Sequence, residues 1–188
     1  MKTFFSFICV TLLGSVSFAQ TFSDPNFAAI PIGSGWNQPV GAAFNSTGQK
    51  LFVWERGGRL YVCNRDVNGN YIKQTQAVLN ISPEVGDWSA HGMLGFALHP
   101  NFDTNGLFYV MYVVNRNYLL HFGTPQYNPN APSEFMATIG RITRYKAVTS
   151  GSDLVADPAS RFILLGETKS TGMPILHDSH GVGTLAFA

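Results

Sequence analysis

The sequence predicts an all-β protein with a β-propeller fold. Short apolar segments alternate with turns that contain Gly or Asn, and helical periodicity is nearly absent beyond the N-terminal segment. Only 12% of the 188 residues are charged, whereas 19 are Gly, 15 are Phe and 7 are Tyr, a composition typical of sheet-rich and turn-rich folds. One apolar motif also repeats along the chain, at intervals that suit the blades of a propeller.

The N-terminal segment has the pattern of a secretory signal. Lys2 precedes a short apolar run, and small residues occupy the cleavage site that follows it, so we expect residues 1–19 to be a signal peptide. No segment reaches the roughly 18 apolar residues that a membrane span needs. The sequence therefore predicts a secreted or periplasmic protein without a transmembrane segment, in which a lead-in over residues 20–35 precedes a partial propeller over residues 36–188.

Removal of residues 1–19 leaves Cys63 as the only cysteine and leaves equal numbers of acidic and basic residues. A single cysteine forms no internal disulfide, so core packing must hold the exported chain together. We interpret Cys63 as a small buried apolar group. The balanced charge provides no basic field for nucleic acid, which is therefore not expected as a partner.

The predicted strands follow one another in order and are joined by turns. Residues 50–55 and 59–63 flank a Gly57-Gly58 turn, and Asn68-Gly69 supplies a second hairpin turn before residues 71–79. The segment from Asn115 to Glu134 is rich in Asn, Pro and Tyr and is expected to be an inserted loop. Further strands are predicted at residues 106–114, 139–146 and 161–165.

Three apolar octets share one pattern. Residues 180–187 (HGVGTLAF) align without gaps with residues 91–98 (HGMLGFAL) and more weakly with residues 37–44 (NQPVGAAF). We expect these octets to be the innermost strands of successive blades, with the small Ala that they share at the crowded central channel. The first interval accommodates the four short strands of one blade, and the longer second interval accommodates a blade plus the inserted loop.

A propeller needs at least about four blades to close. The sequence supplies two blades and the first strand of a third, so we expect it to be the N-terminal fragment of a longer protein. On this interpretation His91 and His180 lie just before an inner strand, at the mouth of the channel.

Three segments give the chain a resemblance to a known family. They are residues 92–110, which contain GMLGFALHPNF and NGLFYV, residues 55–62 (ERGGRLYV) and residues 142–145 (ITRY). In these segments, and roughly over residues 36–188, the chain resembles the glucose/sorbosone dehydrogenase family. The resemblance implies a six-bladed propeller in the full-length protein, which would use pyrroloquinoline quinone (PQQ) and calcium to oxidise a sugar hydroxyl, converting an aldose to its lactone.

The resemblance also implies a catalytic base. In the family the base opens the third blade in a pattern His-x-x-Gly-x-Leu, which His180, Gly183 and Leu185 match. A neutral imidazole, with an unperturbed pKa of about 6.5, can accept a proton near neutral pH. His91 occupies the equivalent position in the preceding repeat and, with Gly183, is a weaker candidate for contact with substrate or cofactor. For His91, structural packing is the favoured interpretation.

The implied cofactors divide the chemistry between them. PQQ would accept the hydride, calcium would orient and polarise the quinone, and the electrons would pass to an acceptor of unknown identity. In the family the residues that hold PQQ and calcium lie mostly in later blades. We therefore expect this fragment alone to be inactive.

Two positions depart from the family pattern, and they favour considering other functions. Ala90 stands where a Gln is common, and Thr184 stands where an Arg is common. Ala90 favours an alternative, a non-catalytic propeller at the cell surface that binds a glycan or a protein. A third possibility is a calcium-dependent, lactonase-like propeller.

The remaining polar clusters are assigned structural roles. His177 and Asp178 in a loop are a weak metal signal. Residues 66–70 resemble the start of a calcium loop, but their Gly falls at the fourth position rather than the sixth, so a hairpin turn is preferred. Arg56 and Arg59 could meet an anionic group, but Glu55 and the tight Gly-Gly turn more simply predict a surface ion pair. No metal ligand is therefore predicted within this sequence.

Overall fold

The computed structural model describes residues 24–177 and 181–187. Residues 24–31 belong to a short N-terminal unit that contains no regular helix or strand, and the chain from Ile32 onward forms a second unit. The predicted signal peptide lies outside the described residues, and the predicted lead-in overlaps both units. None of the helices within the described residues is long and apolar enough to cross a membrane.

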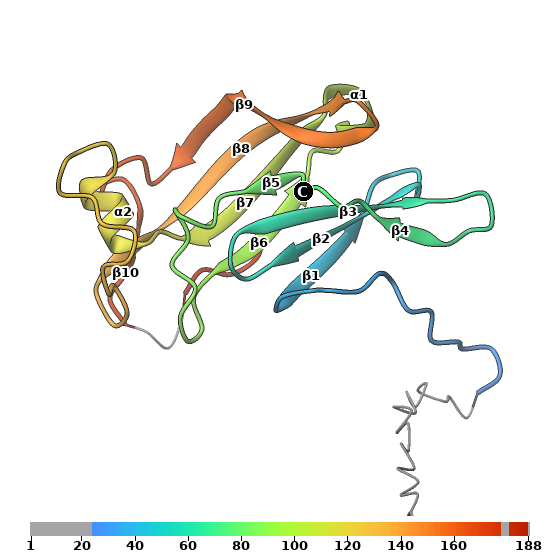
Figure 1. The fold of residues 1–188 in the computed structure, drawn as a ribbon, viewed down its shortest axis with the longest axis horizontal. Coiled ribbons are helices and arrows are strands. Elements are labelled where there is room, and N and C mark those ends of the chain that lie inside the picture. Colours follow the sequence, from blue (N-terminus) through green and yellow to red (C-terminus); the bar gives the residue numbers. More distant parts are fainter. Residues whose placement is uncertain (1–23, 178–180, 188) are drawn as a thin grey trace, which may run out of the picture. The chain divides into compact units, whose positions relative to one another are not determined.

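The first sheet of the second unit is an antiparallel meander. Its strands lie in the order β1-β2-β3-β4, and β5 pairs with the other end of β3 (Figure 1). The Gly57-Gly58 turn between β2 and β3 and the Asn68-Gly69 turn between β3 and β4 are both formed as predicted, with Gly58 and Gly69 at positive φ. The strands are β1 (Pro39–Phe44), β2 (Lys50–Glu55), β3 (Arg59–Arg65), β4 (Tyr71–Lys73) and β5 (Leu79–Asn80).

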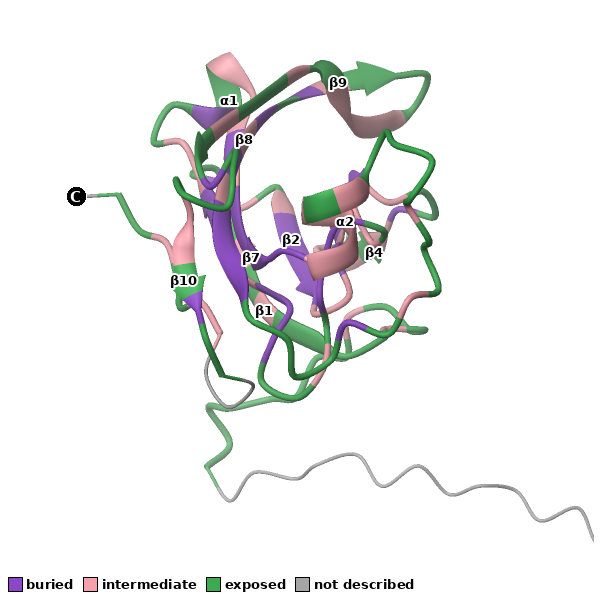
Figure 2. Cartoon of the chain, turned by 90° about the vertical axis from the view of Figure 1, so that its left-hand side faces the viewer, coloured by how far each residue is buried: buried purple, intermediate pink, exposed green. Residues whose placement is uncertain are grey.

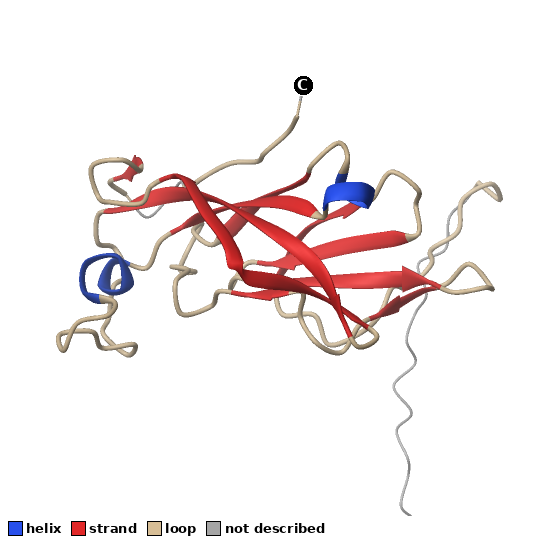
Figure 3. Cartoon of the chain, turned by 90° about the horizontal axis from the view of Figure 1, so that it is seen from above, coloured by secondary structure: helices blue, strands red, loops and turns tan. Residues whose placement is uncertain are grey.

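The second sheet repeats this plan with longer strands. Its order is β10-β8-β7-β6, and β9 pairs with β8. The helices α1 and α2 lie at opposite ends of the sheet (Figures 1 and 3). Its elements are β6 (Met93–Leu98), α1 (Phe102–Asn105), β7 (Leu107–Val113), α2 (Arg116–His121), β8 (Thr138–Ser150), β9 (Asp153–Leu165) and β10 (Met173–Ile175).

The two sheets share one apolar core. Trp54 of β2 packs against Phe96 of β6 with ring centroids 5.2 Å apart, and Phe52 lies between Phe96 and Phe102 at 5.6 and 5.3 Å. Burial of such aromatic rings is a large favourable term in folding. Two neighbouring antiparallel meanders with a common core are successive blades of a β-propeller, so the predicted fold class is confirmed.

The long β8–β9 hairpin reaches back to the first sheet. The backbone N–H of Ala156 donates to the carbonyl oxygen of Val78 at 2.7 Å. The side chain of Gln74 accepts from the N–H of Leu154 at 2.8 Å and donates to the carbonyl oxygen of the same residue at 3.0 Å. Hydrogen bonds therefore join the outer parts of the two sheets, in addition to the core.

The third octet differs from its prediction. Residues 181–187 form no strand, because no described segment makes a backbone ladder with them. They lie against the second sheet: the Phe187 ring contacts Tyr109 with centroids 5.2 Å apart and His99 at 5.5 Å. The segment thus covers the face of the second sheet that the next inner strand of a propeller would cover.

Candidate functional site

The loop before β6 is tied to the end of β2. Arg56 donates from Nη1 to the carbonyl oxygen of Ser89 at 2.9 Å, and its own carbonyl oxygen accepts from the N–H of Met93 at 2.8 Å. The N–H of His91 donates to the carbonyl oxygen of Trp88 at 2.9 Å. These bonds fix the backbone around His91, which starts the second octet.

His91 is buried rather than open to solvent, with 1% of its surface exposed. Its Nε2 lies 3.0 Å from the carbonyl oxygen of His177. Because a carbonyl oxygen only accepts, Nε2 must carry the proton of this hydrogen bond, which leaves Nδ1 as an acceptor in the neutral ring. The ring packs on Trp88 with centroids 5.2 Å apart. The structure therefore joins His91 to the segment that leads to His180.

Several buried nitrogen atoms at this loop have no hydrogen-bond partner among the described residues. They are His91 Nδ1, Trp88 Nε1 and Arg56 Nε. A buried polar atom without a partner costs free energy, so such a group in a native protein calls for a bound molecule or a further segment. This loop is therefore the best candidate for ligand contact that the sequence predicted.

The other predicted site residues are placed only in part. His180 and Asp178 lie outside the described residues. Gly181 lies against the loop, because a Cβ on it would be 3.1 Å from the carbonyl oxygen of Ala90 and 3.3 Å from Cδ2 of His91. Around Gly183, by contrast, no atom lies within 4 Å of the place of a Cβ, so packing does not require glycine there.

The implied cofactors fit the described residues to different degrees. Arg56 and Trp88 supply nitrogen donors of the kind that bind a carboxylate or a quinone oxygen. For calcium, the described ranges bring together no group of three or more His, Cys, Asp or Glu side chains that could hold a metal ion. The described residues therefore do not fit a calcium site.

The predicted surface ion pair at Glu55 is wrong. Glu55 is buried, with 2% of its surface exposed, and its carboxylate accepts from the N–H of Asn37 at 2.7 Å. Arg56 turns away to the Ser89 carbonyl. Cys63 is fully buried as predicted, and burial raises the pKa of its thiol.

A second polar cluster, which the sequence analysis missed, is centred on Glu84. One carboxylate oxygen, Oε1, accepts from the Tyr112 hydroxyl at 2.5 Å, from Arg161 Nη2 at 2.8 Å and from Arg141 Nη1. Burial, and then the negative charge of Glu84, raise the pKa of Tyr112 well above its usual value, so this phenol stays protonated and donates. No local sequence motif predicts this cluster, because its members Glu84, Arg141 and Arg161 are far apart in the sequence.

Comparison with known proteins gives a match to one family and a match to one individual protein. The family described as glucose/sorbosone dehydrogenase matches residues 36–161, a range that contains both sheets down to the first part of β9. The human Hedgehog-interacting protein is 34% identical over 86 residues, which are 44% of this chain and 12% of that protein.

Solved structures give weaker likenesses. A glucose dehydrogenase is 16% identical, with a TM-score of 0.46 over 70% of this chain and 30% of its own. The PQQ-bound form of an aldose sugar dehydrogenase from Streptomyces coelicolor is 21% identical, with a TM-score of 0.41 over 72% of this chain and 34% of its own. The chain thus spans about a third of these structures and a smaller share of the curated relative.

Proposed function

Because the chain belongs to the glucose/sorbosone dehydrogenase family, we propose that it is part of an exported quinoprotein that oxidises an aldose to its lactone. The observation that supports this proposal most is the family match over residues 36–161, which includes the His91 loop. Residues 1–19 would direct export, as their sequence pattern predicts.

In the proposed reaction the C1–H bond of the sugar breaks as a hydride while the anomeric O–H loses its proton, and a carbonyl group forms. PQQ, when bound, would accept the hydride. His180 would take the proton on an imidazole nitrogen. This role rests on the His-x-x-Gly-x-Leu pattern, since the family match ends before His180.

His91 would act as a positioning residue in this scheme. It donates to the carbonyl oxygen of His177 and packs against Gly181, and these two residues flank the segment that carries His180. A buried, hydrogen-bonded support restricts the conformations of the chain segment it holds. The unpaired nitrogens of Arg56 and Trp88 would meet the quinone from the same loop.

The test uses the intact natural protein, reconstituted with PQQ and calcium and assayed for dye reduction with a panel of aldoses. A His180→Asn variant should lose about a hundredfold or more of kcat while it still binds PQQ, as expected for removal of a general base. His121→Asn, a change on α2, is the matched control and should be fully active. If the wild type neither binds PQQ nor reduces the dye, the proposal fails.

A second candidate is a non-catalytic propeller that binds a protein or a glycan at the cell surface. The identity with the Hedgehog-interacting protein supports it, because the name of that relative describes binding rather than catalysis. Ala90, in place of the common Gln, supports it too. Absence of PQQ binding by absorbance titration, together with saturable binding of a defined glycan, would favour this candidate over the dehydrogenase.

A further inference from the structure

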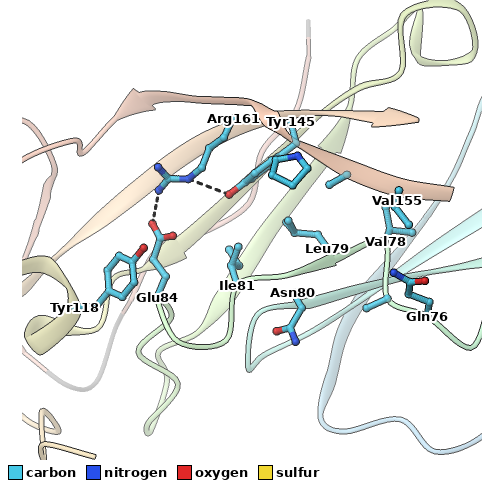
Figure 4. Close-up of a pocket in the computed structure, with 13 residues that line it drawn as sticks. Gln76, Val78, Leu79, Asn80, Ile81, Glu84, Tyr118, Tyr145, Val155 and Arg161 are labelled. Atoms are coloured by element: carbon cyan, nitrogen blue, oxygen red, sulfur yellow. Dashed lines mark hydrogen bonds and ion pairs between the residues drawn. The ribbon is translucent and has the colours of Figure 1, made fainter. Parts of the chain in front are cut away.

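A pocket of about 400 Å³ lies between the outer part of the first sheet and β9 (Figure 4). None of the residues with unpaired nitrogens around His91 lines it. It is lined by the segment from Gln76 to Ile81 and by Val155, Ala156 and Pro158 of β9, and these two segments are joined by the hydrogen bond from Ala156 to Val78. Glu84, Tyr118, Tyr145 and Arg161 line its remaining side.

The charges at this pocket do not balance. Arg141 and Arg161 both pair with the single carboxylate of Glu84, and these are the ion pairs that the described residues form. The lining tyrosines cannot supply the missing negative charge. Burial raises the pKa of Tyr145, and it raises the pKa of Tyr118 to about 12, so both are neutral at physiological pH. The cluster therefore carries one net positive charge.

Arg161 brings this excess charge to the pocket. Its side chain is 33% exposed, whereas that of Arg141 is only 5% exposed. Nε of Arg161 donates to the Tyr145 hydroxyl at 3.2 Å and Nη2 donates to Glu84, while Nη1 bonds to no other residue in the described part of the chain. A guanidinium held in this way is preorganised to donate to a carboxylate.

The rest of the lining suits a small ring with hydroxyl groups. The Tyr145 hydroxyl accepts from Arg161, so its proton is free for an acceptor in the pocket. Tyr118 is held by a stacked contact with Phe122, with ring centroids 4.2 Å apart. Leu79 adds apolar surface on the side that faces Tyr145 (Figure 4). This combination of few polar groups with apolar walls is that of a small-molecule site.

We propose that this pocket binds a monosaccharide carboxylate, with the carboxylate group on Arg161 and the sugar ring against Tyr118 and Tyr145. The bound anion would neutralise the excess charge of the Glu84 cluster. The site is separate from the proposed dehydrogenase chemistry and does not depend on it.

The first experiment compares two ligands that differ only in charge. Methyl glucuronoside carries a carboxylate, and methyl glucoside carries a neutral hydroxymethyl group in its place. Neither has a free anomeric hydroxyl, so neither can be oxidised at that carbon by the proposed dehydrogenase. Titration of the intact protein without PQQ, followed by calorimetry at low salt, should detect saturable binding of the glucuronoside and little of the glucoside. Equal binding of both, or of neither, would overturn the proposal.

Variants then locate the site. Arg161→Gln should weaken glucuronoside binding by about tenfold or more, since it removes a charge-assisted contact. Lys146→Gln removes one exposed positive charge from the neighbouring strand β8 and should change binding less than about twofold. Ala77→Phe fills the pocket while Arg161 stays in place, so it should also abolish binding even if Arg161→Gln fails to fold. Full binding by the Ala77→Phe variant would contradict the assignment.

Discussion

The inner strands β1 and β6 come from the same repeated octet but differ in burial. Each pairs antiparallel with the next strand and each has a register shift before its glycine, Gly41 or Gly95. Yet β1 has no fully buried residue, whereas four of the six residues of β6 are buried. Strand β6 lies between the first sheet and the segment 181–187, while β1 has such a neighbour on one side only. Burial of a blade therefore depends on its neighbours as much as on its own sequence.

The two sheets also differ in the partners of their buried glutamates. Glu55 of the first sheet accepts one hydrogen bond from a backbone N–H. Glu84, which faces the second sheet, forms ion pairs with two guanidinium groups and accepts from Tyr112. Figure 2 shows the second sheet most deeply buried along β7, next to this cluster. The first sheet is held mainly by apolar packing, and the second also depends on a buried ionic cluster.

The largest expected change in stability comes from removing the charge of Glu84, and a matched change at Glu55 tests the difference between the two glutamates. Glu84→Gln keeps the shape of the side chain but leaves the buried Arg141 without an anion, and we expect it to lower the free energy of unfolding by about 3–5 kcal/mol. Glu55→Gln removes a buried carboxylate that forms no ion pair within the described part of the chain and should cost only about 1 kcal/mol. Urea denaturation of both variants measures the difference. Equal losses would mean that the ionic cluster contributes nothing beyond burial.

A smaller effect distinguishes the two octets. In Gly41→Ala the new Cβ would lie 2.2 Å from Cζ2 of the buried Trp54 ring, so the ring must move, at a cost of about 2–3 kcal/mol. In Gly95→Ala the new Cβ would lie 3.0 Å from Cβ of Met111 and 3.1 Å from the Gly183 carbonyl oxygen, a milder conflict of about 1 kcal/mol. Thermal unfolding of the pair checks this order. Gly41→Ala in the exposed strand β1 should therefore lower the unfolding temperature more than Gly95→Ala in β6. The reverse order would show that the segment 181–187 packs more rigidly than Trp54.

The smallest effect concerns a contact that joins the two sheets. The Asp103 carboxylate accepts from Ser46 at 2.5 Å and from Asn45 at 2.6 Å, and these bonds hold its pKa below the usual value. Because the folded pKa is the lower one, the stabilisation is complete above the unfolded pKa of about 4 and is lost as the pH falls through the folded pKa. The carboxylate is largely exposed, so the loss should stay below about 0.5 kcal/mol.

Stability measured between pH 6 and pH 2 in wild type and in Asp103→Asn isolates this contribution. The two curves should converge as the pH falls, since the protonated Asp103 and the amide are then both neutral. If the difference in the free energy of unfolding between the two proteins stayed constant over this pH range, ionisation of Asp103 would not contribute to stability. Ser46→Ala, which removes one donor, serves as the partner in a double-mutant cycle.

Much of the fold was predictable because its strands are marked locally. Strands β2 and β3 are short apolar runs on either side of a Gly-Gly turn, and β7 is a nearly continuous apolar run. Strand β9 was predicted only over its last five residues, because Asp153, Asp157 and Pro158 break up its first, half-exposed part. Helix α2 was missed, although Asn115 is a recognisable cap whose side chain accepts from the N–H of Tyr118.

The candidate sites were predictable to a lesser extent. The repeated octets led to His91, but not to its burial or its bond to His177, since these depend on chain segments 86 residues apart. The Glu84 cluster joins residues separated by 57 and 77 positions, and each of them alone resembles an ordinary surface charge. Long-range pairing of charges leaves no periodic trace, so only the folded chain reveals it.

The return of the β8–β9 hairpin to the first sheet has a consequence for how the protein unfolds. Repeat proteins often lose their units one after another, because each unit contacts only its neighbours through side chains. Here the hydrogen bonds of Ala156 and Leu154 must break before either sheet can detach. We therefore expect the two sheets to unfold as a single cooperative unit, with their central amide protons released to solvent together in a hydrogen-exchange experiment.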